Sequence, residues 1–278
     1  MGHSVNLALG AVLLVGTTAV TTAVMLLLRR RAPAGSYFAD GDRAAGIFGV
    51  LATGFSVLVG FIIFLAFESY DASRSGAETE AITVAQQVET AQFMSRRTAD
   101  ELTGELVCYG RSVVGKEWPA MEDGSIGNTV NPWGLEMFRT LRSVVPQTAP
   151  EQSAYDRWME QTATRQQARQ DRVHGAEGVL PWPLWVVLLV LSCLIFVFVL
   201  FFADSAELAA SQGLMMASVT LVVTLLLFLL VFFDRPHGEG SGKLAPTAMV
   251  RALSRIDNEL TLVHLDVTPP CDSRGGAR

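Results

Sequence analysis

Four runs of apolar residues, each close to the length that crosses a lipid bilayer, constrain this fold more than any other feature of the sequence. About 20 residues at helical rise span the hydrocarbon of a membrane. Half of the 278 residues are hydrophobic and only 17% are charged, which is typical of membrane proteins. We therefore predict an all-α, multi-pass protein of the cell membrane with transmembrane helices at Val5–Leu28, Ala45–Phe67, Trp182–Ala203 and Gly213–Phe233.

The second run leads directly into charged sequence. Its charges begin at Glu68, and no proline follows before the polar stretch is well under way, so one helix should leave the membrane and continue in water. Gly76 is the only weak point for that continuation. Small residues recur every four positions on this run, which marks faces where another helix can pack closely: Gly49 and Thr53, and Ala52, Ser56 and Gly60.

The chain divides by composition into four parts. We expect a first transmembrane hairpin (1–67), an extramembrane helical bundle (68–180), a second transmembrane hairpin (181–234) and a C-terminal amphipathic helix with its tail (235–278). Each bundle helix carries a narrow apolar stripe, so the helices should pack together as a small bundle.

Capping signals set the predicted helix ends within the bundle. Thr98 and Glu101 form a capping box, so a helix should start there after a break near Ser95, and Pro119 should end it. A second capping box, Thr148 with Glu151, should open a polar helix that buries a stripe including Trp158 and Met159.

The C-terminal region should end in one more helix. Its apolar residues are spaced four, three, four and three apart, as in the heptad seam of a coiled coil: Met249, Leu253, Ile256, Leu260 and Val263. A seam of this length is too short to form a stable coiled coil alone. We therefore expect the helix to pack on the bundle, and self-association stays open. The tail from Thr268 to Arg278 should be disordered. Three scattered cysteines, Cys108, Cys193 and Cys271, predict neither a disulfide framework nor a thiolate metal site.

Charge and motif content argue against several functions. The net charge is −6, and the excess lies in the bundle segment, which disfavours nucleic acid as a partner. The histidines are isolated, and no metal-ligand, phosphate-loop or nucleophile-elbow motif occurs, so we expect no enzyme activity, no cofactor and no metal. No apolar run has an acid, base or histidine in its interior, which disfavours proton pumps and voltage sensors.

Charged residues gather where two apolar runs end, in the stretch after the second run and at the end of the fourth. If all four runs cross the membrane, both ends lie on one side, and the residues could form a collar at a pore mouth, where carboxylates attract cations. An interfacial cluster of ion pairs that fixes helix register explains the same pattern and is favoured. The residues are Glu68, Asp71, Arg74, Glu78, Asp234 and Arg235.

The orientation in the membrane stays open. Arg29–Arg31, in the short connection after the first run, place that connection in the cytoplasm and the bundle outside by the positive-inside rule. Basic residues near span ends on the bundle side count in the opposite direction: Arg165, Arg169, Arg172, Arg235 and Lys243.

Several short motifs, in their order and spacing, resemble the bacterial bestrophin-like domain over roughly Ala45 to Leu260. They are the run Phe67–Arg74 after the second span, Glu117-Trp118-Pro119, Leu180-Pro181 and Phe233-Asp234-Arg235-Pro236. The resemblance implies a relative of bestrophins, which are ring-shaped ion channels, usually pentamers, with four spans, a cytosolic helical part and a neck lined by apolar residues of the second helix.

Two functions from different classes follow. The first is a homo-oligomeric, bestrophin-like protein of the lipid bilayer that conducts ions. The second is a non-conducting, membrane-anchored helical scaffold or sensor that binds a partner protein through its acidic bundle or its C-terminal helix. The state of the protein in mild detergent and an ion-flux assay separate the two.

Overall fold

The computed structural model describes residues 7–124, 130–238, 240 and 242–278, and the predicted start of the first helix at Val5 lies outside them. The described chain is helical, with isolated bridges at His237–Leu244 and Cys271–Ala277 in place of strands. It divides into two compact units, a membrane unit (5–68 and 179–234) and a bundle unit (69–178 and 235–278). Helix α2 (Gly41–Ala91) belongs to both and runs without interruption, as the sequence predicted.

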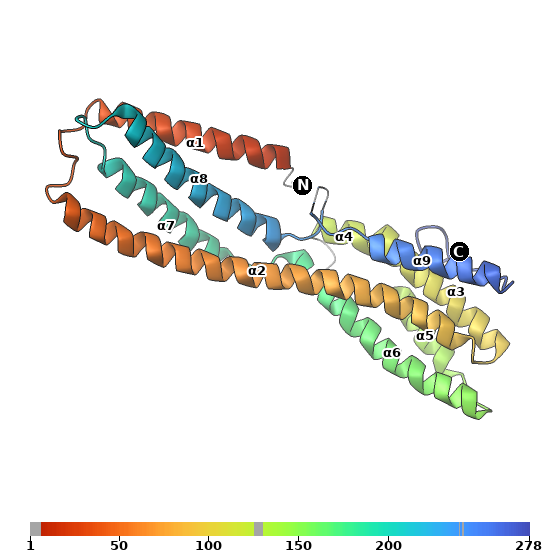
Figure 1. Cartoon of the computed structure of the whole chain (residues 1–278). Coiled ribbons are helices and arrows are strands. Elements are labelled where there is room, and N and C mark those ends of the chain that lie inside the picture. The colour runs from red at the N-terminus through yellow and green to blue at the C-terminus, as the bar shows by residue number, and fades with distance from the viewer. Residues whose placement is uncertain (1–6, 125–129, 239, 241) are drawn as a thin grey trace. The chain divides into compact units, whose positions relative to one another are not determined.

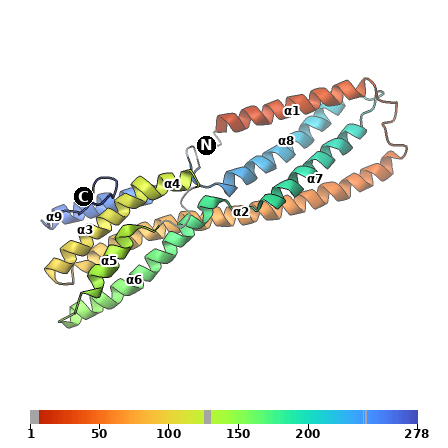
Figure 2. The same cartoon turned by 180° about the vertical axis from the view of Figure 1, so that it is seen from behind.

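The membrane unit holds four helices long and apolar enough to cross a bilayer: α1 (Leu7–Arg29), α2, α7 (Trp182–Phe201) and α8 (Ala209–Asp234). Helix α1 lies along α8 (Figures 1 and 2), and the hydroxyl groups of Thr21 and Thr220 bridge them at 2.8 Å. One face of α2 packs on α7 and α8 through Phe55, Val59 and Ile62. Side chains from three helices therefore close an apolar core.

The bundle unit contains the rest of α2 and five α-helices, α3 (Arg96–Ser112), α4 (Trp118–Glu122), α5 (Pro132–Arg142), α6 (Ala149–His174) and α9 (Thr247–Leu262). They enclose one apolar core around Leu102, Leu106 and Trp158. Met249 and Ile256 of α9 are buried in this core, so the predicted packing of α9 on the bundle is confirmed.

Two of the predicted helix ends are wrong, each because of one local feature. Helix α3 begins at Arg96 because Ser95, three residues before the expected cap, accepts a hydrogen bond from the backbone N–H of Thr98. Pro119 does not end the helical path, because a π-helical turn at Val113–Glu117 leads into α4 and places Pro119 in the first turn of a new helix. There the missing N–H of proline costs little. The capping box at Thr148 is confirmed.

Helix α6 buries a different stripe from the one expected. Trp158 is buried, but Met159 is 45% exposed, and the stripe continues through Gln161, Arg165 and Arg172. Helix α6 packs closely on Gly76 of α2, because a Cβ atom there would lie 2.6 Å from the backbone oxygen of Ala168. Gly76 is thus a packing position and not a break in α2.

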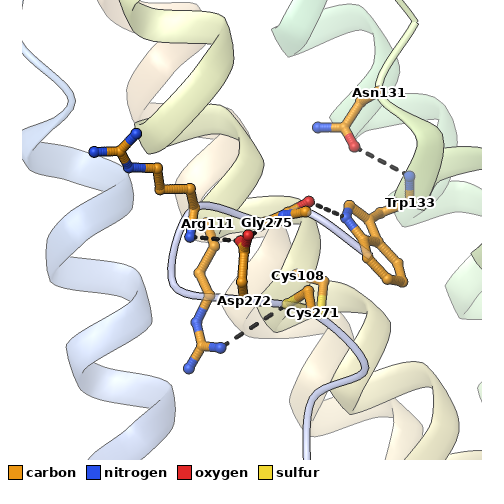
Figure 3. The surroundings of a disulfide bond; sticks show 9 residues. Cys108, Arg111, Asn131, Trp133, Cys271, Asp272 and Gly275 are labelled. Carbon is orange, nitrogen blue, oxygen red and sulfur yellow. Dashed lines mark hydrogen bonds between the residues drawn. A yellow bond between two sulfur atoms is a disulfide. The ribbon is translucent and has the colours of Figure 1, made fainter. Parts of the chain in front are cut away.

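A disulfide corrects the prediction for the cysteines and the tail. Cys108 of α3 and Cys271 are bonded, with both side chains fully buried, and the loop they close spans 163 residues (Figure 3). Trp133 Nε1 donates to the backbone oxygen of Gly275 at 2.8 Å, and Asp272 N donates to Gly276 O, so the tail is folded and not disordered. Sequence spacing could not reveal the pairing, because the partners meet only after α3 and the tail have packed.

Candidate functional site

The face of α2 that points away from α7 and α8 is a candidate site within the membrane unit. Val50, Val57, Phe61 and Phe64 lie on it at helical spacing, and they are 76%, 68%, 61% and 59% exposed. Phe55, Val59 and Ile62 on the other face are at most 3% exposed. We call the exposed set the α2 stripe. One copy of the chain leaves this stripe uncovered.

The small-residue faces predicted on α2 also lie open. Gly49, Thr53, Ser56 and Gly60 are exposed and Ala52 is half-buried. A Cβ atom built on Gly49 or Gly60 would meet nothing within 4 Å. No helix of the described chain packs closely on these glycines, and close approach by another helix stays a prediction.

Three of the predicted collar carboxylates are exposed and belong to α2. Glu68, at the end of the membrane unit, is exposed, as are Asp71 and Glu78 in the bundle unit. Arg74 pairs with Glu78 at 3.4 Å, with both side chains more than half exposed. A pair so open to water contributes at most about 1 kcal/mol to stability.

Asp234 and Arg235 are placed differently from each other. Asp234 is 7% exposed, and its Oδ1 accepts hydrogen bonds at 2.9 Å from the backbone N–H groups of Val179 and Leu180. This carboxylate fixes the segment that enters α7. Arg235 is exposed, and its backbone oxygen accepts a hydrogen bond from Lys243 Nζ. The role of all six collar residues at a pore stays a prediction.

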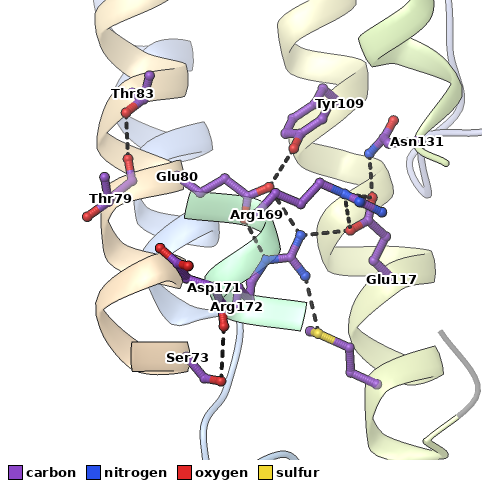
Figure 4. Close-up of polar contacts among 11 residues, drawn as sticks. Ser73, Thr79, Glu80, Thr83, Tyr109, Glu117, Asn131, Arg169, Asp171 and Arg172 are labelled. Atoms are coloured by element: carbon purple, nitrogen blue, oxygen red, sulfur yellow. Dashed lines mark hydrogen bonds and ion pairs between the residues drawn. The ribbon is translucent and has the colours of Figure 1, made fainter. Parts of the chain in front are cut away.

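The bundle unit holds a buried ionic network that the sequence analysis did not find (Figure 4). Its centre is Arg172 of α6, which is fully buried. Arg172 Nε and Nη2 donate to the two carboxylate oxygens of Glu80 at 2.5 and 3.1 Å, and Nη2 also donates to Glu117 Oε2 at 2.7 Å. A bidentate contact of this kind fixes direction as well as distance. It therefore ties α2 to α6 and to the π-helical turn.

Three further side chains complete the network. Tyr109 donates to Glu80 Oε1 at 2.5 Å, Asn131 Nδ2 donates to Glu117 Oε1 at 2.8 Å, and Arg169 Nε lies 3.2 Å from Glu117 Oε2. Each buried carboxylate thus has several donors, as a buried charge requires.

The environment shifts the ionisation of the network residues. Burial alone would raise the pKa of Glu117, but the charges of Arg172 and Arg169 outweigh it and lower that pKa below its ordinary value. Burial, reinforced by the charge of Glu80, raises the pKa of Tyr109, so the phenol stays protonated. Glu117 therefore stays charged and Tyr109 stays neutral near neutral pH, and their contacts tie the helices of the bundle together.

His237 lies beside this network. Burial, together with the positive charges of Arg172 and Lys243, lowers its pKa to about 4. Its ring packs edge-on against Trp118 at 5.5 Å, and neither ring nitrogen has a hydrogen-bond partner among the described residues. The imidazole is therefore neutral at physiological pH.

One sequence signal could have revealed the network. Arg165, Arg169 and Arg172 are spaced four and three apart, which puts three guanidinium groups on one face of α6. A basic face in an otherwise acidic segment needs carboxylate partners from other helices. Glu80 and Glu117 supply them, but their pairing depends on how the helices pack.

The described residues contain no group of three or more His, Cys, Asp or Glu side chains placed to hold a metal ion. We assign no cofactor to either unit.

Comparisons with known proteins bear on the fold and the family. The chain is similar in structure to two crystallised variants of a bacterial bestrophin homologue from Klebsiella pneumoniae, with TM-scores of 0.63 and 0.64 at 12% sequence identity. The matches cover 88% and 92% of this chain and 98% of each of those chains. A crystallised membrane protein variant matches with a TM-score of 0.66 at 12% identity, over 89% of this chain and 98% of that one.

Among curated proteins none matches the sequence. The model of the Bestrophin-like domain matches residues 12–242, which is most of the chain. The helical fold, the four bilayer-length helices and this match agree with the resemblance found in the sequence. The protein is a membrane protein that belongs to the Bestrophin-like family.

Proposed function

We propose that this protein assembles as a homo-oligomeric ring in the cell membrane and conducts cations along the α2 stripe. The observation that carries the proposal is the stripe itself, a continuous row of large apolar side chains that one chain exposes on a helix rich in open glycines. Copies of the chain arranged around an axis would turn this row inward.

The chemistry of the row supports a pore. Phe61 and Phe64 would form an apolar constriction, and such constrictions gate pores by excluding water. Glu68 follows Phe64 at four residues and Asp71 follows at three more, so exposed carboxylates come next on α2. Rings of carboxylates attract cations and repel anions. Membership of the Bestrophin-like family is consistent with this arrangement.

The first experiment measures size and flux. In mild non-ionic detergent, light scattering should give a mass several times the 30.0 kDa of one chain. In liposomes, a fluorescence assay should record cation flux that empty vesicles lack. A stable monomer would contradict the ring, and absent flux from a verified oligomer would favour a scaffold instead.

The second experiment tests the path. The double variant Glu68→Gln/Asp71→Asn should reduce the cation-to-anion permeability ratio several-fold. Its matched control is Asp257→Asn/Asp266→Asn, which removes the same charge from exposed positions near the C-terminus and should leave the ratio unchanged. Phe64→Ala should raise conductance, because it shortens the apolar constriction. Unchanged permeation in both α2 variants would place the path elsewhere.

A further inference from the structure

The disulfide bears on which side of the membrane the bundle faces. Cys108 and Cys271 have no exposed surface, and their bond joins α3 to the C-terminal tail. The tail beyond Cys271 is held by the Trp133–Gly275 hydrogen bond and by Asp272, which accepts from the N–H groups of Arg274 and Gly276. The disulfide is thus an integral part of the bundle core.

Cellular compartments differ in whether such a bond persists. Thiol reductants keep cysteines reduced in the cytosol, whereas disulfides form and persist in extracytoplasmic, oxidising spaces. The third cysteine, Cys193, is unpaired and lies in α7, away from this bond. The cysteines outside the membrane-length helices are therefore the two that pair. A buried disulfide in the bundle indicates an oxidising environment around the bundle.

The two segments of the bundle unit must share one side of the membrane. Residues 69–178 and 235–278 form one compact unit, and the disulfide links them. The connections at 30–40 and 202–208 lie at the other ends of the helices that the unit joins. With four crossings, both connections lie on the side opposite the bundle.

The charge distribution points the same way. The short connection after α1 carries Arg29, Arg30 and Arg31, and the short turn between α7 and α8 has acidic residues but no Lys or Arg. Positive charge in short loops marks the cytoplasmic side. This rule assigns both connections to the cytoplasm.

Most of the basic residues on the bundle side are weak evidence against this orientation. Arg165, Arg169 and Arg172 belong to a connecting segment of more than a hundred residues, and such long segments are translocated largely regardless of charge. In the folded bundle Arg172 is buried against Glu80 and Glu117. Of these five residues, Arg235 and Lys243 still count, against Arg29, Arg30, Arg31 and Arg43 in and beside the first connection.

We infer that the helical bundle and the C-terminal tail face the oxidising, extracytoplasmic side, with both short connections in the cytoplasm. This orientation is opposite to the cytosolic helical part that the bestrophin resemblance implies. The inference rests on the disulfide and on the arginine cluster and is independent of ion conduction. It would make the α2 carboxylates face the outside of the cell.

The first test counts reactive thiols in cells. Cells expressing the full chain are lysed in denaturant with a maleimide-coupled polyethylene glycol, before or after reduction. We expect one modified cysteine, Cys193, without reduction and three with it. Three modified cysteines without reduction would show that the bond is absent in the cell and would overturn the inference.

The second test maps the sides directly. In a Cys193→Ser background that keeps the disulfide, single cysteines are introduced as Asp156→Cys on α6 and Ser205→Cys in the α7–α8 turn, two exposed positions. A membrane-impermeant maleimide should label the first variant in intact cells and the second only after permeabilisation. The reverse pattern, or equal labelling of both in intact cells, would overturn the inference. Neither test measures flux, so its outcome is separate from that of the proposed function.

Discussion

Replacing Arg172 by methionine should destabilise the bundle severely. The guanidinium is fully buried and donates to both Glu80 and Glu117, which are 0% and 6% exposed. Methionine fills similar space but leaves the Glu80 carboxylate with the Tyr109 hydroxyl as its donor among the described residues, whereas Glu117 keeps Arg169 and Asn131. Breaking a buried ion pair on one side costs about 3–5 kcal/mol. Most of that penalty falls on Glu80.

The assay is thermal unfolding of the full chain in mild non-ionic detergent. A loss of this size lowers the unfolding temperature on the order of 10 °C for a chain of this length. The matched control is Arg157→Met on the same helix, because its pair with Glu160 is 61% and 70% exposed and contributes less than about 1 kcal/mol.

Two further measurements make the reasoning refutable. An unpaired buried carboxylate is relieved by taking up a proton, so the deficit of Arg172→Met should shrink as pH falls from 8 to 5. The double variant Glu80→Gln/Arg172→Met removes the unpaired charge and should recover about half of the lost stability. A change of under about 2 °C, or a deficit that is the same at every pH, would show that the network is not an energetic lock.

Three more predictions address other positions. Gly76→Ala should cost about 3 kcal/mol in unfolding experiments, because its Cβ would lie 2.6 Å from the backbone oxygen of Ala168, whereas Gly46→Ala, with nothing within 4 Å, should be neutral. The unfolded chain binds a proton at His237 more readily than the folded chain does, so the free energy of unfolding falls as pH drops from 6.5 towards 4, by about 2.5 kcal/mol at pH 4.5. The variant His237→Phe should remove this loss when stability is measured over the same pH range. Burial raises the pKa of Glu105 from 4.5 to about 7, so stability falls as pH rises between these two values, and Glu105→Gln should raise the unfolding temperature at pH 8 but not at pH 5.

The fold could be predicted from the sequence because its strongest signals are local. Bilayer-length apolar runs and the uninterrupted charge pattern after Phe67 each depend on a short stretch of chain, and both set the architecture. The capping box at Thr148 worked for the same reason. Helix ends were less certain where two signals competed, as at Ser95 and Thr98, since both can cap and the chain uses the first.

The features that sequence reasoning missed all join distant segments. The Cys108–Cys271 bond closes 163 residues, and the link from Arg172 to Glu80 spans 92. Nothing in the local pattern around Cys271 distinguishes a folded tail from a disordered one, because its order comes from α3 and Trp133. The buried polar residues of α6 escaped prediction for the same reason, because their partners lie on other helices.

The spacing along α2 decides what can cover its open face. A face turned to lipid can be apolar throughout the membrane, but it gains nothing from glycines that leave space for a helix to approach. The α2 stripe also leads at helical spacing from Phe61 and Phe64 to Glu68, and a carboxylate needs water or a partner. A ring of several copies around one axis satisfies both conditions. Neighbouring helices can approach each other over the small residues, and the carboxylates stay in water. This is why we propose that other copies of the chain, and not lipid, cover the open face of α2.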